Sequence, residues 1–179
     1  MIGRKKIYII LTFTGTILSR LIRLWTKDEY CHVSIALDKD LNDIYSFGRI
    51  NPYNPFIGGF IKEGIDIGTF KRFRNTKTAI YSLDVSNLQY RRVVKKIKHF
   101  KKNKKLYKFN IIGLFSVALK VPFKRENYFY CSEFVKYIIE EAKIDLDLPD
   151  LVRPMDFKKN NLDLIYTGYL KNYQREKID

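Results

Sequence analysis

Apolar and polar positions in the first part of the chain fall into short, separate runs. Residues 7–13 are Ile, Leu, Tyr, Thr and Phe, which predicts a buried strand. Residues 19–25 carry apolar side chains at helical spacing and predict a short helix. Residues 32–37 alternate incompletely, as expected for a strand partly covered on both faces, and residues 44–47 follow a polar turn as its hairpin partner.

The middle of the chain is less regular. Residues 49–68 contain two prolines and four glycines, which predicts a long surface loop. Residues 78–83 predict a strand that ends near Asp84 and Ser86, either of which can cap the helix predicted at residues 88–102. The apolar positions of this helix share one face, and they are Leu88, Val93, Val94, Ile97 and Phe100.

Three segments complete the pattern. Residues 109–119 are mostly apolar and predict a buried helix that Pro122 ends. Residues 132–142 predict a helix that begins beside Cys131, and residues 151–169 predict a loop followed by a final strand or turn.

The N-terminal apolar run has a second interpretation. It follows Arg4, Lys5 and Lys6, an order that secretory signal peptides also have. However, no small-residue cleavage site follows, and the run is too short to cross a bilayer. A buried strand is favoured, with a signal or anchor segment as the alternative.

Composition sets the outer limits. With 179 residues, of which 46% are hydrophobic, the chain can bury a substantial core, and we expect one domain over residues 1–179. The formal net charge of +15 favours an anionic partner: nucleic acid, a membrane surface with acidic lipids, or another anionic polymer.

The cysteines and histidines restrict the chemistry. Two cysteines do not make a disulfide framework, and two histidines give no zinc-binding spacing, so we expect no metal and no cofactor. A reduced, cytoplasmic setting is the simplest expectation, with association with the cell envelope as an alternative.

Cys131 and His32 are the candidate reactive pair. A thiol at a helix N-terminus lies near unpaired backbone N–H groups and the positive end of the helix dipole, which stabilise the thiolate. A histidine within reach stabilises it further and protonates a leaving group. Because His99 lies on the basic helix, His32 is the better candidate. The alternative for Cys131 is a small, inert core residue.

The segments that carry these residues, YCHVSIALD and YFYCSEFVKYIIEEA, resemble the circularly permuted branch of the papain-like NlpC-type cysteine hydrolases. In that branch the histidine strand precedes the cysteine helix, as in lecithin:retinol acyltransferase-like proteins and a group of bacterial amidases. The resemblance covers most of the chain. It implies an α+β, permuted papain-like fold in which a small, mostly antiparallel sheet packs against helices.

The resemblance also implies a third polar residue that orients the histidine from the next strand. Ser46 falls at that position, where the family has Glu, His, Asn or Gln. A serine hydroxyl accepts a hydrogen bond but cannot offset imidazolium charge. Glu63, Asp43 or a water molecule are the alternatives for this role.

Other residues complete the predicted site. Tyr30, Tyr130 and Glu63 are candidates for contacting the substrate, although core packing is an equal alternative for the tyrosines. The backbone N–H of Cys131 is the first candidate donor to an oxyanion. If His32 faces the Cys131 helix, strand alternation turns Cys31 away and excludes a Cys31–Cys131 disulfide.

We therefore expect a cysteine hydrolase or acyltransferase with Cys131 as nucleophile and His32 as base and acid. The resemblance implies substrates of the peptidoglycan-peptide or lipid-linked acyl type. A competing hypothesis is a non-catalytic protein whose basic helix, residues 91–105, binds nucleic acid or an anionic membrane surface.

Overall fold

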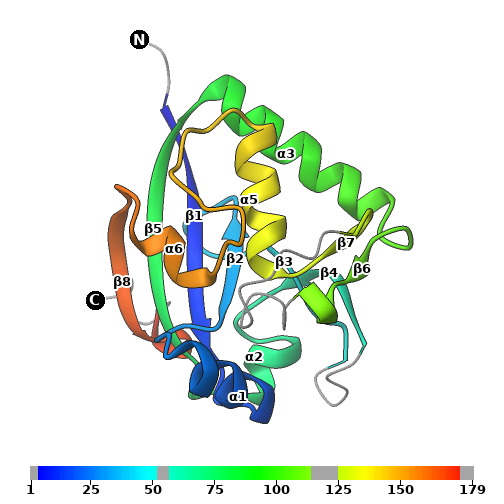
Figure 1. Cartoon of the computed structure of the whole chain (residues 1–179). Coiled ribbons are helices and arrows are strands. Elements are labelled where there is room, and N and C mark those ends of the chain that lie inside the picture. Colours follow the sequence, from blue (N-terminus) through cyan, green and yellow to red (C-terminus); the bar gives the residue numbers. More distant parts are fainter. Residues whose placement is uncertain (1–3, 52–56, 114–124, 174–179) are drawn as a thin grey trace.

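A six-stranded antiparallel sheet forms the centre of the protein (Figure 1). The computed structural model describes residues 4–51, 57–113 and 125–173. Along the sheet the strands are β4 (Gly58–Glu63), β3 (Ile44–Arg49), β2 (His32–Ala36), β1 (Arg4–Phe13), β5 (Lys77–Ser86) and β8 (Asp163–Tyr169). A separate parallel pair consists of β6 (Lys108–Phe109) and β7 (Tyr128–Phe129). The helices are α1 (Ile17–Thr26), α2 (Gly68–Arg72), α3 (Asn87–Lys102), α5 (Cys131–Glu141), α6 (Pro154–Lys158) and the 3-10 helix η1 (Leu170–Asn172). The chain is α+β with a mostly antiparallel sheet, as the sequence predicts at this level.

Strand β1 lies inside the sheet and is covered on both faces. Ile7 and Ile9 pack in one apolar cluster together with α3 and α5, whereas Tyr8 and Ile10 pack in a second cluster on the opposite face with α2 and η1. Burial on both faces explains why residues 7–13 lack an apolar–polar alternation. The N-terminal run is thus a central strand, as predicted.

An aromatic cluster joins the sheet to the two long helices. Phe47 of β3 and Phe100 of α3 lie edge to face at 5.8 Å between ring centroids, and each lies close to Phe134 of α5, at 5.2 and 5.1 Å. Phe60 of β4 packs against the same rings. These contacts fix the position of α5 over β2 and β3, and with it the position of Cys131.

The predicted long loop at residues 49–68 is wrong in its second half, which forms β4. Gly58 and Gly59 suggested a loop, but they lie in a strand at a crowded place. A Cβ at Gly58 would come within 2.8 Å of the Phe109 side chain and 2.9 Å of the Gly48 carbonyl oxygen. Glycine is therefore needed for close packing of β4 against β6. The prolines of this segment lie outside the described residues.

The C-terminal part also differs from the prediction. Residues 151–156 are not all loop, because Pro154 begins α6 at a helix position that tolerates the missing N–H. The final strand or turn predicted within residues 151–169 is strand β8, which begins at Asp163 and ends at Tyr169. Of the buried helix predicted at residues 109–119, Phe109 belongs instead to β6, residues 111–113 are helical, and residues 114–119 lie outside the described residues.

Helix α3 confirms the predicted capping and most of the predicted face. Ser86 is the N-cap, and it forms a capping box with Gln89: the Ser86 hydroxyl accepts from the Gln89 N–H, and the Ser86 N–H donates to the Gln89 side chain. Val93, Ile97 and Phe100 are buried, but Leu88 is 52% exposed. Leu88, in the first turn of α3, is therefore not part of the buried face.

Truncation of Phe100 tests the aromatic cluster as the support of α5. We expect Phe100→Ala to reduce the free energy of unfolding by about 3–5 kcal/mol, because it leaves a cavity among buried rings. Leu88→Ala, on the same helix but exposed, should change it by about 0.5 kcal/mol or less. Urea unfolding followed by circular dichroism measures both, and equal losses in the two variants would contradict the assignment.

Candidate active site

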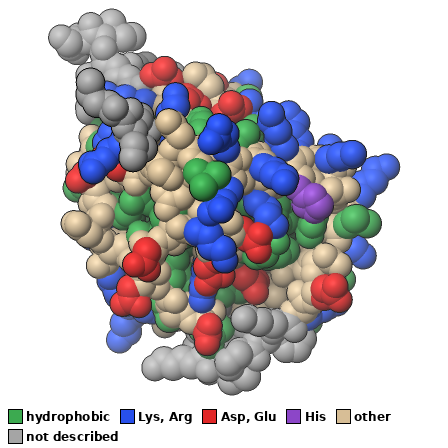
Figure 2. Space-filling view, turned by 90° about the horizontal axis from the view of Figure 1, so that it is seen from above, with side chains coloured by type: hydrophobic (Ala, Val, Ile, Leu, Met, Phe, Trp, Pro, Cys, Tyr) green, Lys and Arg blue, Asp and Glu red, His purple; other side chains and the backbone are tan. Residues whose placement is uncertain are grey.

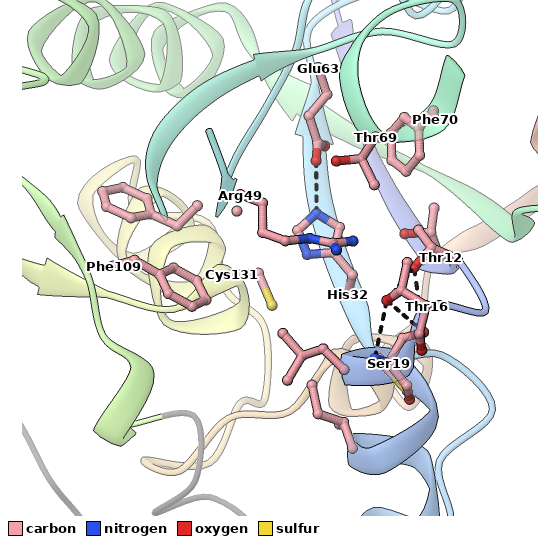
Figure 3. A pocket seen from close by; sticks show the side chains of 16 residues that line it. Thr12, Thr16, Ser19, His32, Arg49, Glu63, Thr69, Phe70, Phe109 and Cys131 are labelled. Atoms are coloured by element: carbon pink, nitrogen blue, oxygen red, sulfur yellow. Dashed lines mark hydrogen bonds and ion pairs between the residues drawn. The ribbon is translucent and has the colours of Figure 1, made fainter. Parts of the chain in front are cut away.

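One pocket beside the ends of strands β1, β2 and β3 collects side chains from distant parts of the sequence (Figure 3). Its lining includes Cys131 of α5, His32 of β2, Glu63 of β4 and Arg49 of β3, with Thr12 of β1 on the other side. Residues of α1 and α2 close the remaining sides. The structure thus brings together the two residues predicted as the reactive pair.

Cys131 is the first residue of α5. The preceding Tyr130 is extended and acts as the N-cap without a side-chain hydrogen bond, so the first turn keeps its unpaired N–H groups. The thiol is buried, with the residue only 4% exposed, and it lies beside the Ser132 hydroxyl at 3.8 Å. A hydrogen bond from the Val33 backbone also favours its thiolate. The position matches the predicted one.

His32 is the first residue of β2 and pairs in register with Thr12 of β1. Its Nε2 lies 3.0 Å from Oε1 of Glu63, and the Ser34 hydroxyl lies 3.3 Å from the same nitrogen. Because Nε2 is engaged by Glu63, Nδ1 is the ring nitrogen left to interact with Cys131. The side chain is 22% exposed, so the ring borders the pocket.

Glu63 is the last residue of β4 and is buried, with 8% of its side chain exposed. Ser34 donates a hydrogen bond to its other carboxylate oxygen, Oε2. Both oxygens are therefore engaged. The registers align Glu63 with Ile44 and, through it, with Ala36, so the carboxylate reaches Ser34 and His32 diagonally across the intervening strand β3.

Charge coupling governs the ionisation of these three groups. Burial disfavours the imidazolium, but the Glu63 carboxylate and Cys131 outweigh it and raise the pKa of His32 to about 10. Burial likewise opposes ionisation of Glu63, but His32 and Ser34 lower the pKa of this carboxyl. For Cys131, burial is again outweighed, here by His32, and its pKa is lowered. Both shifts therefore favour a thiolate–imidazolium pair over a neutral thiol beside a neutral imidazole.

The pKa shifts of His32 and Glu63 also determine how each residue contributes to the stability of the fold at different pH values. The pKa of His32 is raised above its ordinary value of 6.5, so its contribution is complete below that pH and is lost as the pH rises through about 10. The pKa of Glu63 is lowered from 4.5, so its contribution is present above that pH and is lost on acidification.

Ser46 does not occupy the third position predicted for it. It lies in β3 and is fully buried, but its hydroxyl forms no well-aligned hydrogen bond within the described residues. It approaches Glu63 closely enough to help lower the pKa of that carboxyl, after His32 and Ser34. The partner of His32 is Glu63, which the sequence offered as an alternative and as a substrate contact. Asp43 instead forms an ion pair with Lys62 at 2.8 Å.

The predicted tyrosines lie elsewhere. Tyr30 and Tyr130 are each 4% exposed and do not line the pocket. Burial raises the pKa of both hydroxyls. Core packing, the alternative interpretation of these residues, fits their positions, and neither is placed to contact a ligand in this pocket.

Both cysteines are free thiols. The Cys31 thiol donates to the Ser19 carbonyl oxygen of α1 at 3.4 Å, and Cys31 borders the same pocket as Cys131. Cys31 precedes the first residue of β2, so strand alternation alone does not fix its direction. Burial raises its pKa to about 12. Cys131 is therefore the more acidic thiol.

Among the residues that the sequence did not place at the site are Ser34, Arg49 and Thr12. Ser34 is two positions after His32 in the same strand, a spacing that places both on one face and could have indicated it. Arg49 and Thr12 carried no such signal, because only the pairing of distant strands brings them to the pocket.

Comparison with known proteins adds no family assignment. A scan against models of protein families matches none, and a search of curated proteins finds no similar sequence.

Within the described ranges, no group of three or more His, Cys, Asp or Glu residues lies close enough together to hold a metal ion. No helix in the described part of the chain is long and apolar enough to cross a membrane.

Substitution of Glu63 tests the charge coupling. In a Cys31→Ser background, so that Cys131 is the only thiol, Glu63→Gln removes the carboxylate that raises the pKa of His32. We expect the pH midpoint of Cys131 alkylation by iodoacetamide to rise by about one unit or more, equivalent to about tenfold less thiolate below both midpoints.

The matched control is Asp66→Asn. It removes the same charge three positions away, where Asp66 is exposed and pairs with Arg74. The control should keep the wild-type midpoint. An unchanged midpoint in Glu63→Gln would mean that Glu63 does not influence Cys131.

Proposed function

We propose that this protein is a cysteine hydrolase or acyltransferase with a circularly permuted papain-like fold. The observation that carries the proposal is the electrostatic coupling among Glu63, His32 and Cys131, with the cysteine at the first position of a helix. A buried thiol that served only packing would have its pKa raised, as Cys31 has. Cys131 has the opposite direction of shift.

The proposed reaction has two steps. The Cys131 thiolate attacks the carbonyl carbon of an amide or ester, a C–S bond forms, and the C–N or C–O bond breaks as His32 protonates the leaving amine or alcohol. In the second step, water or an acceptor alcohol or amine attacks the thioester, and His32 takes its proton as the thiolate leaves. Glu63 holds the ring so that Nδ1 faces the sulfur and offsets the imidazolium charge.

Stabilisation of the tetrahedral intermediate is assigned to the backbone N–H of Cys131. This N–H belongs to the first turn of α5, where no intrahelical acceptor is available, and it lies at the positive end of the helix dipole. The developing oxyanion would therefore be bound by a group that needs no reorganisation.

The order of elements supports the permuted fold. The histidine strand β2 precedes the cysteine helix α5 in sequence, and α5 packs over β2 and β3. The carboxylate comes from a strand of the same sheet. The substrate classes in this proposal are peptidoglycan-type peptides and lipid-linked acyl groups. A reducing compartment such as the cytoplasm would keep both thiols free.

Replacement of Cys131 tests this function. With p-nitrophenyl acetate as probe, the wild-type protein should acquire one acetyl group on Cys131 and release p-nitrophenolate, as peptide mass mapping and absorbance measure. Cys131→Ala should lose the modification and at least about 1,000-fold in turnover rate, because the nucleophile is gone. Cys31→Ala, the matched control, should retain both. Equal turnover in wild type and Cys131→Ala would overturn the proposal.

Binding to an anionic polymer is the second candidate function. Figure 2 shows Lys and Arg side chains gathered on the face that is seen from above. Helix α3 supplies exposed basic residues: Arg91, Lys95, Lys98, Lys101 and Lys102. Lys96 is instead paired with Glu141 at 2.5 Å. This face can neutralise phosphates without reading a base sequence.

Salt dependence tests the second candidate. If α3 binds nucleic acid, affinity for a duplex DNA of random sequence should fall steeply with salt concentration, and Lys95→Glu/Lys98→Glu/Lys102→Glu should reduce the logarithmic slope by about one for each lost phosphate contact. Fluorescence anisotropy measures the affinity. Cys131→Ala should leave the affinity unchanged. A slope that is equal in the wild type and the triple variant would exclude the basic face of α3 as the nucleic-acid-binding surface.

A further inference from the structure

Arg49 brings a positive charge into the candidate active site. It is the last residue of β3, and its half-buried side chain lines the same pocket as His32 and Cys131 (Figure 3). Within the described part of the chain, no other Lys or Arg lines this pocket. The mechanism proposed above uses Cys131, His32 and Glu63 but leaves this guanidinium without a role.

Arg49 has no carboxylate partner among the described residues. Its guanidinium carbon lies 5.9 Å from the centre of the Phe73 ring, and Arg72 packs on the same ring at 5.5 Å. Burial and the positive charge of Arg72 lower the pKa of Arg49. A half-buried cation held beside another cation is unfavourable unless an anion offsets the charge.

Within the described residues, Glu63 is the only carboxylate that lines this pocket, but both of its oxygens already have partners. One of its oxygens pairs with His32 and the other accepts from Ser34. The positive charge of His32 is the largest effect that lowers the pKa of Glu63. The guanidinium of Arg49 therefore keeps its hydrogen-bond donors available for a ligand.

The shape around Arg49 also suits a ligand that extends beyond Cys131. A second cavity adjoins the first and shares Arg49, Glu63, Thr69 and Phe70 with it. Opposite, the Thr12 hydroxyl borders the first cavity, is fully buried and has no hydrogen-bond partner within the described residues. An unsatisfied buried hydroxyl in a pocket is a group that a polar ligand can satisfy.

We infer that Arg49 binds an anionic group of the substrate, a carboxylate or a phosphate, while the reactive carbonyl lies at Cys131. The inference rests on the proposed function for the position of that carbonyl. A guanidinium is planar and donates two parallel hydrogen bonds to a carboxylate or phosphate, so it selects such groups by geometry as well as by charge. Arg49 would thus set specificity for acidic substrates without taking part in bond breaking.

Charge-selective alkylation of Cys131 tests the inference without a known substrate. Iodoacetate and iodoacetamide both react by displacement, in which the thiolate forms an S–C bond and iodide leaves, but only iodoacetate carries a carboxylate. In a Cys31→Ser background, we expect Arg49→Gln to lower the ratio of the iodoacetate rate to the iodoacetamide rate by about tenfold, the effect of losing one charged hydrogen bond. Arg49→Lys should retain part of the preference.

The control for total charge is Arg91→Gln, an exposed position on α3 outside the pocket. It should leave the ratio unchanged. An equal ratio in wild type and Arg49→Gln would overturn the inference.

Competition by propionate and by inorganic phosphate distinguishes a carboxylate from a phosphate as the bound group. The anion that protects Cys131 from iodoacetate at the lower concentration identifies the preferred group.

A second measurement separates this inference from the proposed function. Failure of both reagents to modify Cys131 would count against the nucleophile alone. In Cys131→Ala, propionate or inorganic phosphate at constant ionic strength should still raise the melting temperature, because a ligand that binds only the folded state stabilises it. Arg49→Gln should abolish the increase. If neither anion stabilises the Cys131→Ala protein, or if Arg49→Gln retains the increase, the anion site is excluded.

Discussion

The ion pair between His32 and Glu63 is the interaction on which the site depends. Burial alone would leave the imidazole neutral and the thiol of Cys131 protonated. The buried carboxylate reverses the first effect, and the resulting imidazolium reverses the second. Ser34 completes the arrangement by donating to the carboxylate oxygen that His32 does not use. Glu63, hydrogen-bonded to Ser34, thus stabilises the positive charge of His32 against the effect of burial. The lowered pKa of Cys131 follows from that charge.

The sheet delivers these groups to one point. Glu63 and His32 lie on strands separated by β3, and Ser46 of that middle strand is the hydroxyl that approaches the carboxylate without a well-aligned bond. Helix α5 is held over the same strands by the rings of Phe47, Phe100 and Phe134. The aromatic core is therefore not separate from the site: it sets the distance between the helix terminus that carries the thiol and the strand that carries the histidine.

Local pattern was sufficient for much of this fold and for two members of the site. The strand at residues 7–13, the capped helix α3 and the helix at Cys131 each have a strong periodicity or cap within their own residues. Strand β4 was missed because Gly58 and Gly59 are typical of loops, and their actual cause, close approach of Phe109, lies far away in sequence. Glu63 could not be placed without β4. The partner of His32 is fixed by the register between β3 and β4, and no local pattern encodes a register of this kind.

The formal charges of the pocket connect the proposed chemistry with the inferred specificity. In the proposed reaction, the negative charges of the Cys131 thiolate and Glu63 equal the positive charges of His32 and Arg49 before attack. Attack on a substrate carbonyl consumes the thiolate charge, and after His32 gives its proton to the leaving group, Glu63 and Arg49 remain. Through the tetrahedral step the oxyanion lies near the N–H of Cys131, so an anionic substrate group would be best held at a distance from it. Arg49, at the junction with the second cavity, supplies such a position. A substrate anion bound there lies beside a positive charge and away from the developing oxyanion, which reduces the repulsion between the two negative charges.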